Sequence, residues 1–449
     1  MTMRVPLAVM LAWGLGVAAA HAGPVETSIR PEMRVVPVAV QTGAVQGLMA
    51  PKSMRPMQRP SASARPVSTG GAAGIGPDRG FQDWITGFRT RAMAQGIRAD
   101  VLDLAFRGVS YDAEAVRRDR NQSEFTKTIW DYLDSAVSDT RIRNGREALD
   151  RHRTTLDAIE ARYGVEKTVV TAIWGLESAY GTFRGQDNVI RSMATLAYDG
   201  RRGPFFEEQL IAALTILQSG DTSPQTMTGS WAGAMGHTQF MPTSYLDHAV
   251  DFTGDGRRDI WSEDPTDALA STAAYLKHFG WVTGQPWGVE VQLPDGFDYR
   301  LAKRSITKQP SAWSRLGVMD MRGQPVPDHG EAAILLPAGG QGAAFLIFEN
   351  FSVIERYNTA DAYVIGVGHL SDRIGGGAAI QGNWPRGDRA LTYDERKELQ
   401  RRLTAGGFDT RGIDGRIGPL TINAVRAYQV ASGLIPDGYA SLNLLKRLR

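Results

Sequence analysis

One segment near the middle of the chain reads Val169-Val170-Thr171-Ala172-Ile173-Trp174-Gly175-Leu176-Glu177-Ser178-Ala179-Tyr180-Gly181. Its apolar residues Val169, Ile173 and Tyr180 recur at three- and four-residue steps, which is the spacing of one helix face, and Gly181 is suited to the C-cap. Glu177 falls on the same face, so its carboxyl group shares that face with side chains that exclude water. The segment therefore predicts a helix with an acidic side chain where apolar packing is expected.

The environment predicted for Glu177 suits acid catalysis. Partial removal from water raises the pKa of a carboxyl group, and a Glu that holds its proton near neutral pH can donate it to a leaving oxygen. A glycosidic oxygen needs such a donor. A Glu paired with an Arg at the edge of a core would show the same pattern, so this helix alone leaves a catalytic and a structural role open.

Composition narrows the class of protein. The chain has 449 residues, enough for roughly three domains, and 42% of them are hydrophobic, which is ample for packed cores. With 50 Lys and Arg against 48 Asp and Glu, the formal charge of +2 argues against a nucleic-acid binder, which concentrates basic charge. The seven histidines lack the spacing of metal ligands, and the absence of cysteine excludes a Cys nucleophile.

The N-terminal residues resemble a targeting segment. Arg4 supplies positive charge, residues 5–20 are mostly apolar and small, and Ala20-His21-Ala22 fits a signal-peptidase site, so we expect a signal peptide over residues 1–22 and export. The apolar stretch is short and rich in Ala and Gly for a transmembrane anchor, and lipid attachment through an N-terminal Cys is not expected. Residues 23–79, rich in Pro, Ser, Gly and Ala, predict a disordered linker.

Residues 80–374 predict one mainly helical domain. Amphipathic helix patterns occur over residues 101–106, 149–163, 206–218, 268–279, 351–358 and 363–370. Between residues 285 and 341, Val289 to Leu293 alternates, Ala332 to Leu336 is a short apolar run, and Pro and Gly fill the gaps. This sequence pattern predicts a small β-containing insertion within the helical domain.

After an expected linker at residues 375–388, residues 389–449 predict a separate three-helix domain. A first helix carries Leu399 and Leu403, a second opens at Thr421, and a third occupies residues 441–448. A domain of about 60 residues is small but sufficient for one compact core.

A second informative stretch, residues 229–245, combines small residues with uncharged polar ones and reads Gly-Ser-Trp-Ala-Gly-Ala-Met-Gly-His-Thr-Gln-Phe-Met-Pro-Thr-Ser-Tyr. Small residues let a backbone approach a flat ligand, while Ser230, Gln239 and Tyr245 offer hydrogen bonds without charge, which is a way to bind sugars. Tight helix packing through Gly and Ala would explain the small residues but not the polar ones.

These landmarks resemble the lytic murein transglycosylases of the membrane-bound lytic transglycosylase B type, glycoside hydrolase family 103. The resemblance covers residues 81–370 and rests on Gly175-Leu176-Glu177-Ser178, the run from Gly229 to Pro242, Asp251-Phe252-Thr253-Gly254-Asp255-Gly256 and Arg356-Tyr357-Asn358. It implies a lysozyme-like helical catalytic domain in which Glu177 is the single catalytic acid and base. It places along the glycan cleft Ser230, Gln239, Tyr275, Tyr357, Asn358 and Tyr363. His237-Thr238 stands where the family pattern has Tyr-Gly, so the contacts of that loop are open.

The resemblance also implies the reaction. Such enzymes cleave the β-1,4 bond between N-acetylmuramic acid and N-acetylglucosamine without water, because the muramyl C6 hydroxyl attacks C1 and leaves a 1,6-anhydro end. One Glu protonates the leaving oxygen and then removes the proton of the C6 hydroxyl. Two alternatives stay open. One is hydrolysis by a lysozyme-type pair, for which Asp187 is the nearest acidic residue but is expected in a loop; the other is a noncatalytic wall-binding scaffold.

The run from Asp251 to Asp259 suggests a calcium loop. Oxygen-bearing side chains alternate and Gly256 is the sixth residue, but Ser262 is the twelfth, where a standard loop has a bidentate Glu. The resemblance places Asp267 at the end of a shorter loop. The candidate ligands are Asp251, Thr253, Asp255, Arg257 through its main-chain carbonyl, and Asp267. A metal-free turn held by Asp side chains is the alternative. An ion would be structural, and the chemistry is expected to need no cofactor.

The C-terminal module resembles the peptidoglycan-binding domain 1 family through Leu399-Gln400-Arg401-Arg402-Leu403, Asp414-Gly415-Arg416-Ile417-Gly418 and Ala427-Tyr428-Gln429. Asp414 and Thr421 can cap a helix, so a fold-defining role that needs no contact with ligand is open for both. The resemblance implies peptidoglycan glycan strands as the partner, wall-synthesis or division proteins as further partners, no membrane anchor after signal cleavage, and the periplasm of a Gram-negative bacterium.

Overall fold

The computed structural model describes residues 77–121 and 127–449, and helices predominate among them. This confirms the mainly α prediction. The expected signal peptide, residues 1–22, and nearly all of the expected linker, residues 23–79, lie outside the described residues. Helix α1 (Pro77–Ala94) begins inside the last residues of that linker, because a proline at the first position and Asp78 in the first turn both favour a helix start. In the part of the chain that the structure describes, no helix is long and apolar enough to cross a membrane.

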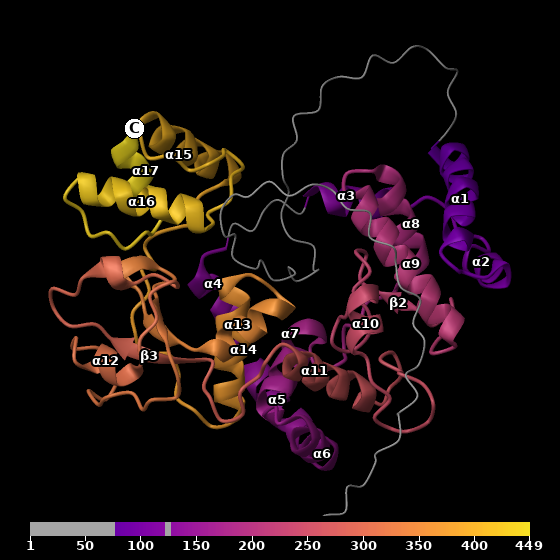
Figure 1. Ribbon diagram of the computed structural model, residues 1–449, viewed down its shortest axis with the longest axis horizontal. Coiled ribbons are helices and arrows are strands. Elements are labelled where there is room, and N and C mark those ends of the chain that lie inside the picture. The colour runs from indigo at the N-terminus through magenta and orange to yellow at the C-terminus, as the bar shows by residue number, and fades with distance from the viewer. Residues whose placement is uncertain (1–76, 122–126) are drawn as a thin grey trace, which may run out of the picture. The chain divides into compact units, whose positions relative to one another are not determined.

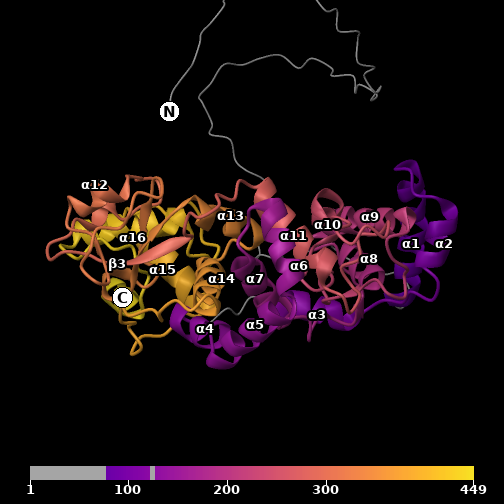
Figure 2. The same cartoon turned by 90° about the horizontal axis from the view of Figure 1, so that it is seen from below.

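The helical domain packs around one large core that includes Phe81, Ile173 and Phe206. After α1, its helices are α2 (Ala99–Ala105), α3 (Ala113–Asn121), α4 (Ile129–Ala136), α5 (Asp139–Arg151), α6 (Arg153–Tyr163), α7 (Lys167–Ser178), α8 (Val189–Asp199), α9 (Gly203–Ser219), α10 (Pro242–His248), α11 (Thr266–His278), α13 (Glu349–Tyr357) and α14 (Asp361–Ile374). Helix α8 packs on α9, and α7 packs on α14 (Figure 1 and Figure 2). The single helix expected over residues 149–163 is divided at His152, which ends α5.

The insertion carries a four-stranded antiparallel sheet of order β4-β3-β6-β5. Its strands are β3 (Gly288–Gln292), β4 (Met319–Asp320), β5 (Ala333–Leu335) and β6 (Ala344–Ile347), joined through the short helix α12 (Pro310–Ser314) and the 3₁₀ turns η1 (Tyr299–Leu301) and η2 (Gly339–Gln341). The register aligns Glu290 with Phe345 and Ile334 with Leu346. A second core surrounds the fully buried Trp313, whose indole N–H donates to the Ala332 carbonyl at 2.7 Å.

Strands β3 and β5 coincide with two segments expected from the sequence, but β6 lies beyond residue 341, the expected end of the insertion. Every residue of β6 is buried. A strand buried on both faces shows no polar alternation, so an apolar run such as Ala-Phe-Leu-Ile cannot be told from a helix segment by its period. The sheet therefore extends the insertion to residue 347.

A further pair of two-residue strands joins the loop after α7 to the stretch 229–245. Strands β1 (Asp187–Asn188) and β2 (Thr228–Gly229) are antiparallel, with Asp187 opposite Gly229. The Asp187 carboxylate lies 3.5 Å from an Arg118 guanidinium nitrogen. Asp187 is thus a strand residue in an ion pair, where a loop residue was expected, because a two-residue strand has no period that a sequence can show.

The C-terminal helices α15 (Tyr393–Ala405), α16 (Pro419–Ala431) and α17 (Leu442–Leu448) surround a small core of their own that includes Leu399, Leu403 and Val425. A capping box between Thr392 and Glu395 fixes the start of α15.

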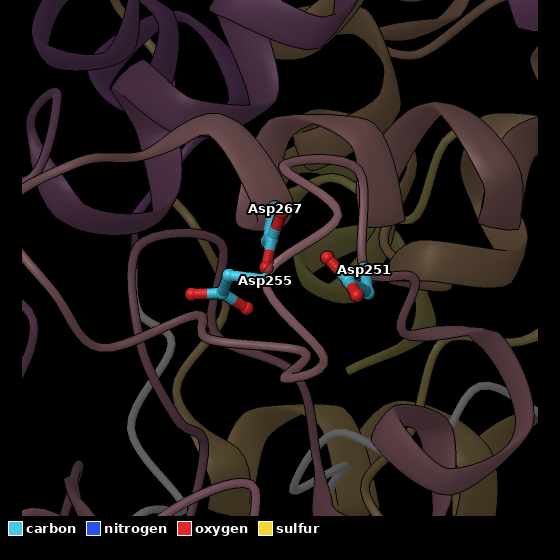
Figure 3. Close-up of side chains that lie close together, drawn as sticks. All are labelled: Asp251, Asp255 and Asp267. Carbon is cyan, nitrogen blue, oxygen red and sulfur yellow. The ribbon is translucent and has the colours of Figure 1, made fainter.

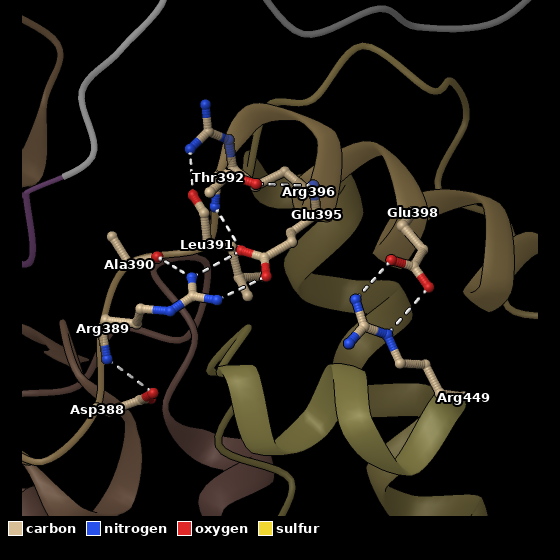
Figure 4. Close-up of polar contacts among 9 residues, drawn as sticks. All are labelled: Asp388, Arg389, Ala390, Leu391, Thr392, Glu395, Arg396, Glu398 and Arg449. Carbon is tan, nitrogen blue, oxygen red and sulfur yellow. Dashed lines mark hydrogen bonds and ion pairs between the residues drawn. The ribbon is translucent and has the colours of Figure 1, made fainter.

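Ion pairs and an amide network brace this small domain. Arg389 donates two hydrogen bonds of 2.7 Å to the Glu395 carboxylate (Figure 4). Helix α16 begins at Pro419, two residues before the start expected at Thr421, because proline suits the first turn. The Thr421 hydroxyl instead lies 3.2 Å from the Gln400 amide, which also donates to Asp414 at 2.8 Å. These contacts give Asp414 and Thr421 fold-defining roles.

Candidate active site

Helix α7 places Glu177 next to its last residue. Ile173, one turn earlier, is fully buried, since α5, α6, α11 and α14 all pack on this helix. Gly175 lets the Tyr180 ring lie against the helix: a Cβ atom at Gly175 would be 2.5 Å from the Tyr180 Cζ atom. The Tyr180 hydroxyl donates to the Arg141 carbonyl at 2.8 Å, which fixes the ring in that position.

The turn after Glu177 has an unusual backbone. Helix α7 ends at Ser178, so the expected extension to a cap at Gly181 is wrong. Ala179, Tyr180 and Gly181 have φ angles of 49°, 60° and 85°, all left-handed. This conformation costs about 1–3 kcal/mol for each residue other than glycine, and such strain is commonly held at functional sites.

Glu177 is half-buried and receives a hydrogen bond from a residue far away in the sequence. The Tyr363 hydroxyl, on α14, donates to Glu177 Oε1 at 2.6 Å, and Tyr363 itself is only 6% exposed. A phenol that donates to one carboxyl oxygen fixes the orientation of the group. Asn358, expected near the same cleft, is the C-cap residue that follows α13, and its side chain accepts a hydrogen bond from the Ala360 amide at 3.1 Å.

Tyr275 and Tyr357 form an aromatic wall with Phe240. The two tyrosine rings lie 5.1 Å apart edge to face, and Phe240 lies within 5.9 Å of each. The Tyr275 hydroxyl donates to the Arg356 carbonyl at 2.7 Å, and the Tyr357 hydroxyl donates to the Thr238 carbonyl at 2.6 Å. The main-chain acceptors hold both rings rigidly, so this wall is preorganised.

The stretch 229–245 folds as a tight loop and the short helix α10. Ser230 N donates to the Ala234 carbonyl and Met235 N to the Phe240 carbonyl, both at 2.8 Å. A side chain at Gly236 would collide with the Ile260 carbonyl. The glycines therefore serve internal packing of the loop, which a sequence pattern could not distinguish from close approach to a ligand.

Two polar residues of this loop face a hollow of about 1050 Å³. Ser230 and Gln239 line it, together with Thr226, Trp261 and Phe183. The Gln239 amide donates to the Arg184 and Gly236 carbonyls at 2.9 Å, which fixes its position despite a left-handed φ of 57°. Phe183 is 74% exposed. Hydroxyl and amide groups beside an exposed aromatic ring are suited to sugars, which need hydrogen bonds and a flat apolar face.

Three of the five candidate ion ligands lie close together. Carboxylate oxygens of Asp251, Asp255 and Asp267 all lie within 4.8 Å of one another (Figure 3). Three carboxylates in such proximity match the oxygen ligands that Ca²⁺ prefers. Glu263, the other residue near the twelfth position, instead pairs with Arg184 and is mostly exposed.

The same carboxylates also hold the loop without an ion. Asp251 accepts the Gly254 and Gly256 amides at 2.6 and 2.8 Å. Asp267 accepts three main-chain N–H groups, including that of Asp259 at 3.0 Å. Burial raises the pKa of Asp267, whereas the Gly256 amide lowers that of Asp251. Each carboxylate oxygen has two lone pairs, so these bonds leave room for a cation.

Comparisons with known proteins identify the family. Residues 80–372 match the model of the transglycosylase SLT domain. The chain belongs to the transglycosylase SLT family. Residues 392–448 match the putative peptidoglycan binding domain.

Comparisons of this transglycosylase SLT protein with individual relatives agree with the family assignment. It is 32% identical over 250 residues to membrane-bound lytic murein transglycosylase B of Escherichia coli (strain K12), an alignment that covers 54% of this chain and 66% of the relative. The crystal structure of SltB3 from Pseudomonas aeruginosa in complex with NAG-anhNAM-pentapeptide is 50% identical, with a TM-score of 0.81 over 83% of this chain and all of that chain. Escherichia coli Slt35 in complex with calcium is 27% identical, with a TM-score of 0.55 over 67% of this chain and 93% of that chain.

Three residues of this transglycosylase SLT domain were not predicted from the sequence to belong to the site. Phe183 and Arg184 follow the left-handed turn, and nothing in their spacing indicates the hollow. His237 was noted only as a departure from the family pattern, yet its buried ring contacts Trp174 of α7. The replacement of the family's Tyr by His237 was the one feature of the sequence that could have pointed to this residue.

Proposed function

We propose that the protein is a lytic transglycosylase that cleaves the β-1,4 bond between N-acetylmuramic acid and N-acetylglucosamine in peptidoglycan and leaves 1,6-anhydromuramic acid ends. The placement of Glu177 carries the proposal. The chain contains a transglycosylase SLT domain, and within it this carboxyl group is half-buried at the end of α7. One of its oxygens accepts a hydrogen bond from the Tyr363 hydroxyl.

Glu177 acts twice in the proposed reaction. Its carboxylic acid first gives a proton to the O4 leaving oxygen as the C1–O4 bond breaks. The resulting carboxylate then takes the proton of the muramyl C6 hydroxyl as that oxygen bonds to C1, so the acid form is restored. The N-acetyl group of the substrate stabilises the positive charge at C1, which removes the need for a second carboxylate.

The remaining residues bind the glycan. Ser230 and Gln239 supply hydrogen bonds beside the hollow. Tyr275 and Tyr357, whose rings are buried, are proposed to support the cleft from behind. Asn358 and Tyr363 complete the expected set.

Product analysis tests the reaction. Purified peptidoglycan is treated with the wild-type protein and with Glu177→Gln, and the soluble products are identified by mass spectrometry. Anhydro-muropeptides from the wild type alone are expected. Products with reducing ends would establish lysozyme-type hydrolysis, although Asp187, the nearest candidate nucleophile, is paired with Arg118. No products from either protein, with wall binding retained, would leave a noncatalytic scaffold.

The C-terminal domain is proposed to hold the enzyme on its insoluble substrate, which raises the local concentration of glycan strands. The family match of residues 392–448 supports this role. Action on peptidoglycan fits the expected export to the periplasm of a Gram-negative bacterium, and wall-synthesis or division proteins are the expected further partners. Fractionation of cells that express the full chain tests the location.

The loop closed by Asp267 is proposed to bind Ca²⁺ as a structural ion, through Asp251, Thr253, Asp255, the Arg257 carbonyl and Asp267. The proximity of the three carboxylates supports it, and the ion would stiffen the segment that precedes α11. No step of the proposed chemistry passes through this ion.

Thermal unfolding tests the ion. A ligand at 100 times its Kd stabilises a protein by about 2.7 kcal/mol, so millimolar Ca²⁺ should raise Tm by several degrees if the site is real. Asp251→Asn should abolish the rise, and Asp328→Asn, in the insertion, should not. An unchanged Tm with Ca²⁺ or with a chelator would establish the metal-free turn.

A further inference from the structure

His237 lies between the catalytic helix and two loops, and its side chain is buried, with 3% exposure. Its Nδ1 atom is 3.2 Å from the indole nitrogen of Trp174, one turn before Glu177. On the other side of Glu177, the Ser178 hydroxyl donates to the His237 carbonyl at 2.5 Å. The ring and the main chain of His237 therefore contact α7 both before and after the catalytic Glu, at Trp174 and at Ser178.

The hydrogen-bond partners fix the tautomer of the ring. An indole N–H can only donate, so Nδ1 must accept and the proton of the neutral ring lies on Nε2. That N–H points to the Ser262 carbonyl at 2.7 Å. Arg184 also lies 3.1 Å from Nε2, but a guanidinium has no lone pair to offer, and it donates to the same Ser262 carbonyl at 2.8 Å.

A second proton on His237 would break this arrangement. The new N–H at Nδ1 would face the N–H of Trp174, and the positive charge would lie next to Arg184. Burial lowers the pKa of His237; the Ser262 carbonyl opposes this and Arg184 adds to it. The acidic groups that face the ring from the loop before α11 are Glu263, already paired with Arg184, and Asp259.

The packing leaves the ring no alternative position. A Cβ atom at Gly181 would lie 2.6 Å from His237 Nδ1, so the left-handed turn after Glu177 closes directly over the imidazole. The Gly181 amide donates at 2.9 Å to the Ser178 hydroxyl that itself holds the His237 carbonyl. Movement of the ring would therefore shift the turn that follows the catalytic residue.

We propose that His237 is a positioning residue for Glu177: its neutral ring, with the proton on Nε2, joins α7 to the Ser262 loop, and its protonation in acid releases the catalytic helix. The proposal rests on the proposed function for its effect on activity, but the protonation state can be measured without turnover.

The tautomer is measured first. The full chain is labelled with ¹⁵N histidine, and the His237 signals are assigned by their loss in His237→Gln. At neutral pH, an unprotonated Nδ1 and a protonated Nε2 are expected, with titration below the pKa of a free histidine. A protonated Nδ1, or an imidazolium at neutral pH, would overturn the proposal whether or not the protein is an enzyme.

Kinetics then separate positioning from simple packing. His237→Phe keeps the ring volume without polar atoms, and kcat on soluble glycan should fall about tenfold or more with KM nearly unchanged. His237→Gln, which offers an acceptor and a donor that do not titrate, should recover most of kcat at neutral pH and lose less of it in acid than the wild type. His329→Gln, on an exposed histidine of the insertion, should keep the wild-type pH profile.

The outcomes are distinct. If His237→Gln keeps the acid limb of the wild type, or if both His237 variants lose kcat equally, the positioning role is wrong. If either variant fails to fold, the tautomer measured in the wild type still tests the proposal. If the wild type makes no anhydro products yet shows the expected tautomer, the proposed function fails and the arrangement of His237 stands.

Discussion

Tyr363 determines how Glu177 is presented, because its hydroxyl bonds one carboxyl oxygen at 2.6 Å. Tyr363→Phe removes a single oxygen from a ring that stays packed on α14. A hydrogen bond to a charged group contributes about 1.5–3 kcal/mol, so kcat should fall by roughly 10- to 100-fold with little change in KM. Steady-state kinetics on soluble glycan measures this. Tyr198→Phe, in the aromatic cluster with Phe81, makes the same chemical change elsewhere and should leave kcat unchanged.

At the scale of elements, helix α7 depends on the absence of a side chain at Gly175. Gly175→Ala would force Cβ against Tyr180, which cannot withdraw without losing its bond to the Arg141 carbonyl. Overpacking of this kind costs about 1–3 kcal/mol, so Tm should fall by several degrees. Gly87→Ala, on the exposed face of α1 with only ordinary contacts, is the control and should leave Tm equal or slightly higher. Equal effects at both positions would contradict the packing argument.

Helix α14 carries a buried histidine that makes stability depend on pH. Burial, together with nearby Arg373, lowers the pKa of His369 to about 4, and His369 is 8% exposed. Its unfolded pKa is about 6.5, so between these values the unfolded chain binds more protons, and stability falls as pH drops from 6.5 towards 4. The loss is about 3 kcal/mol. Urea unfolding at pH 7 and pH 4.5 should show a smaller acid loss in His369→Leu; equal losses would exclude His369 as the cause.

At the scale of the whole molecule, the C-terminal helices have a core of their own, and few hydrogen bonds connect them to the insertion, including that from the Gly340 amide to Asp437 at 3.0 Å. Removal of residues 389–449 should therefore leave cleavage of soluble glycan unchanged. Binding to insoluble peptidoglycan should weaken by about tenfold or more, because the tether no longer raises the local substrate concentration. Pelleting assays with intact peptidoglycan measure the binding. Equal loss of activity on both substrates would mean that the helices stabilise the catalytic domain.

Local sequence patterns predicted much of the fold, and they also indicated Glu177 as the candidate catalytic residue. The helical spacing over residues 206–218 and 268–279 corresponds to α9 and α11, and the alternation at Val289 to Leu293 corresponds to β3. Strand β6 was missed because burial on both faces removes the alternation, and the end of α7 was misplaced because its cap is a left-handed Ala179 in place of a glycine.

The sequence by itself determined the class of fold, the acidic residue on an apolar helix face and the alternating oxygens of the Asp251 loop, because each depends on residues close together in the chain. Only the tertiary structure brought the Tyr363 hydroxyl to Glu177 and placed the His237 ring between Trp174 and Ser262. Those contacts join segments up to 186 residues apart. Their geometry follows from the packing of whole helices, which no local period records.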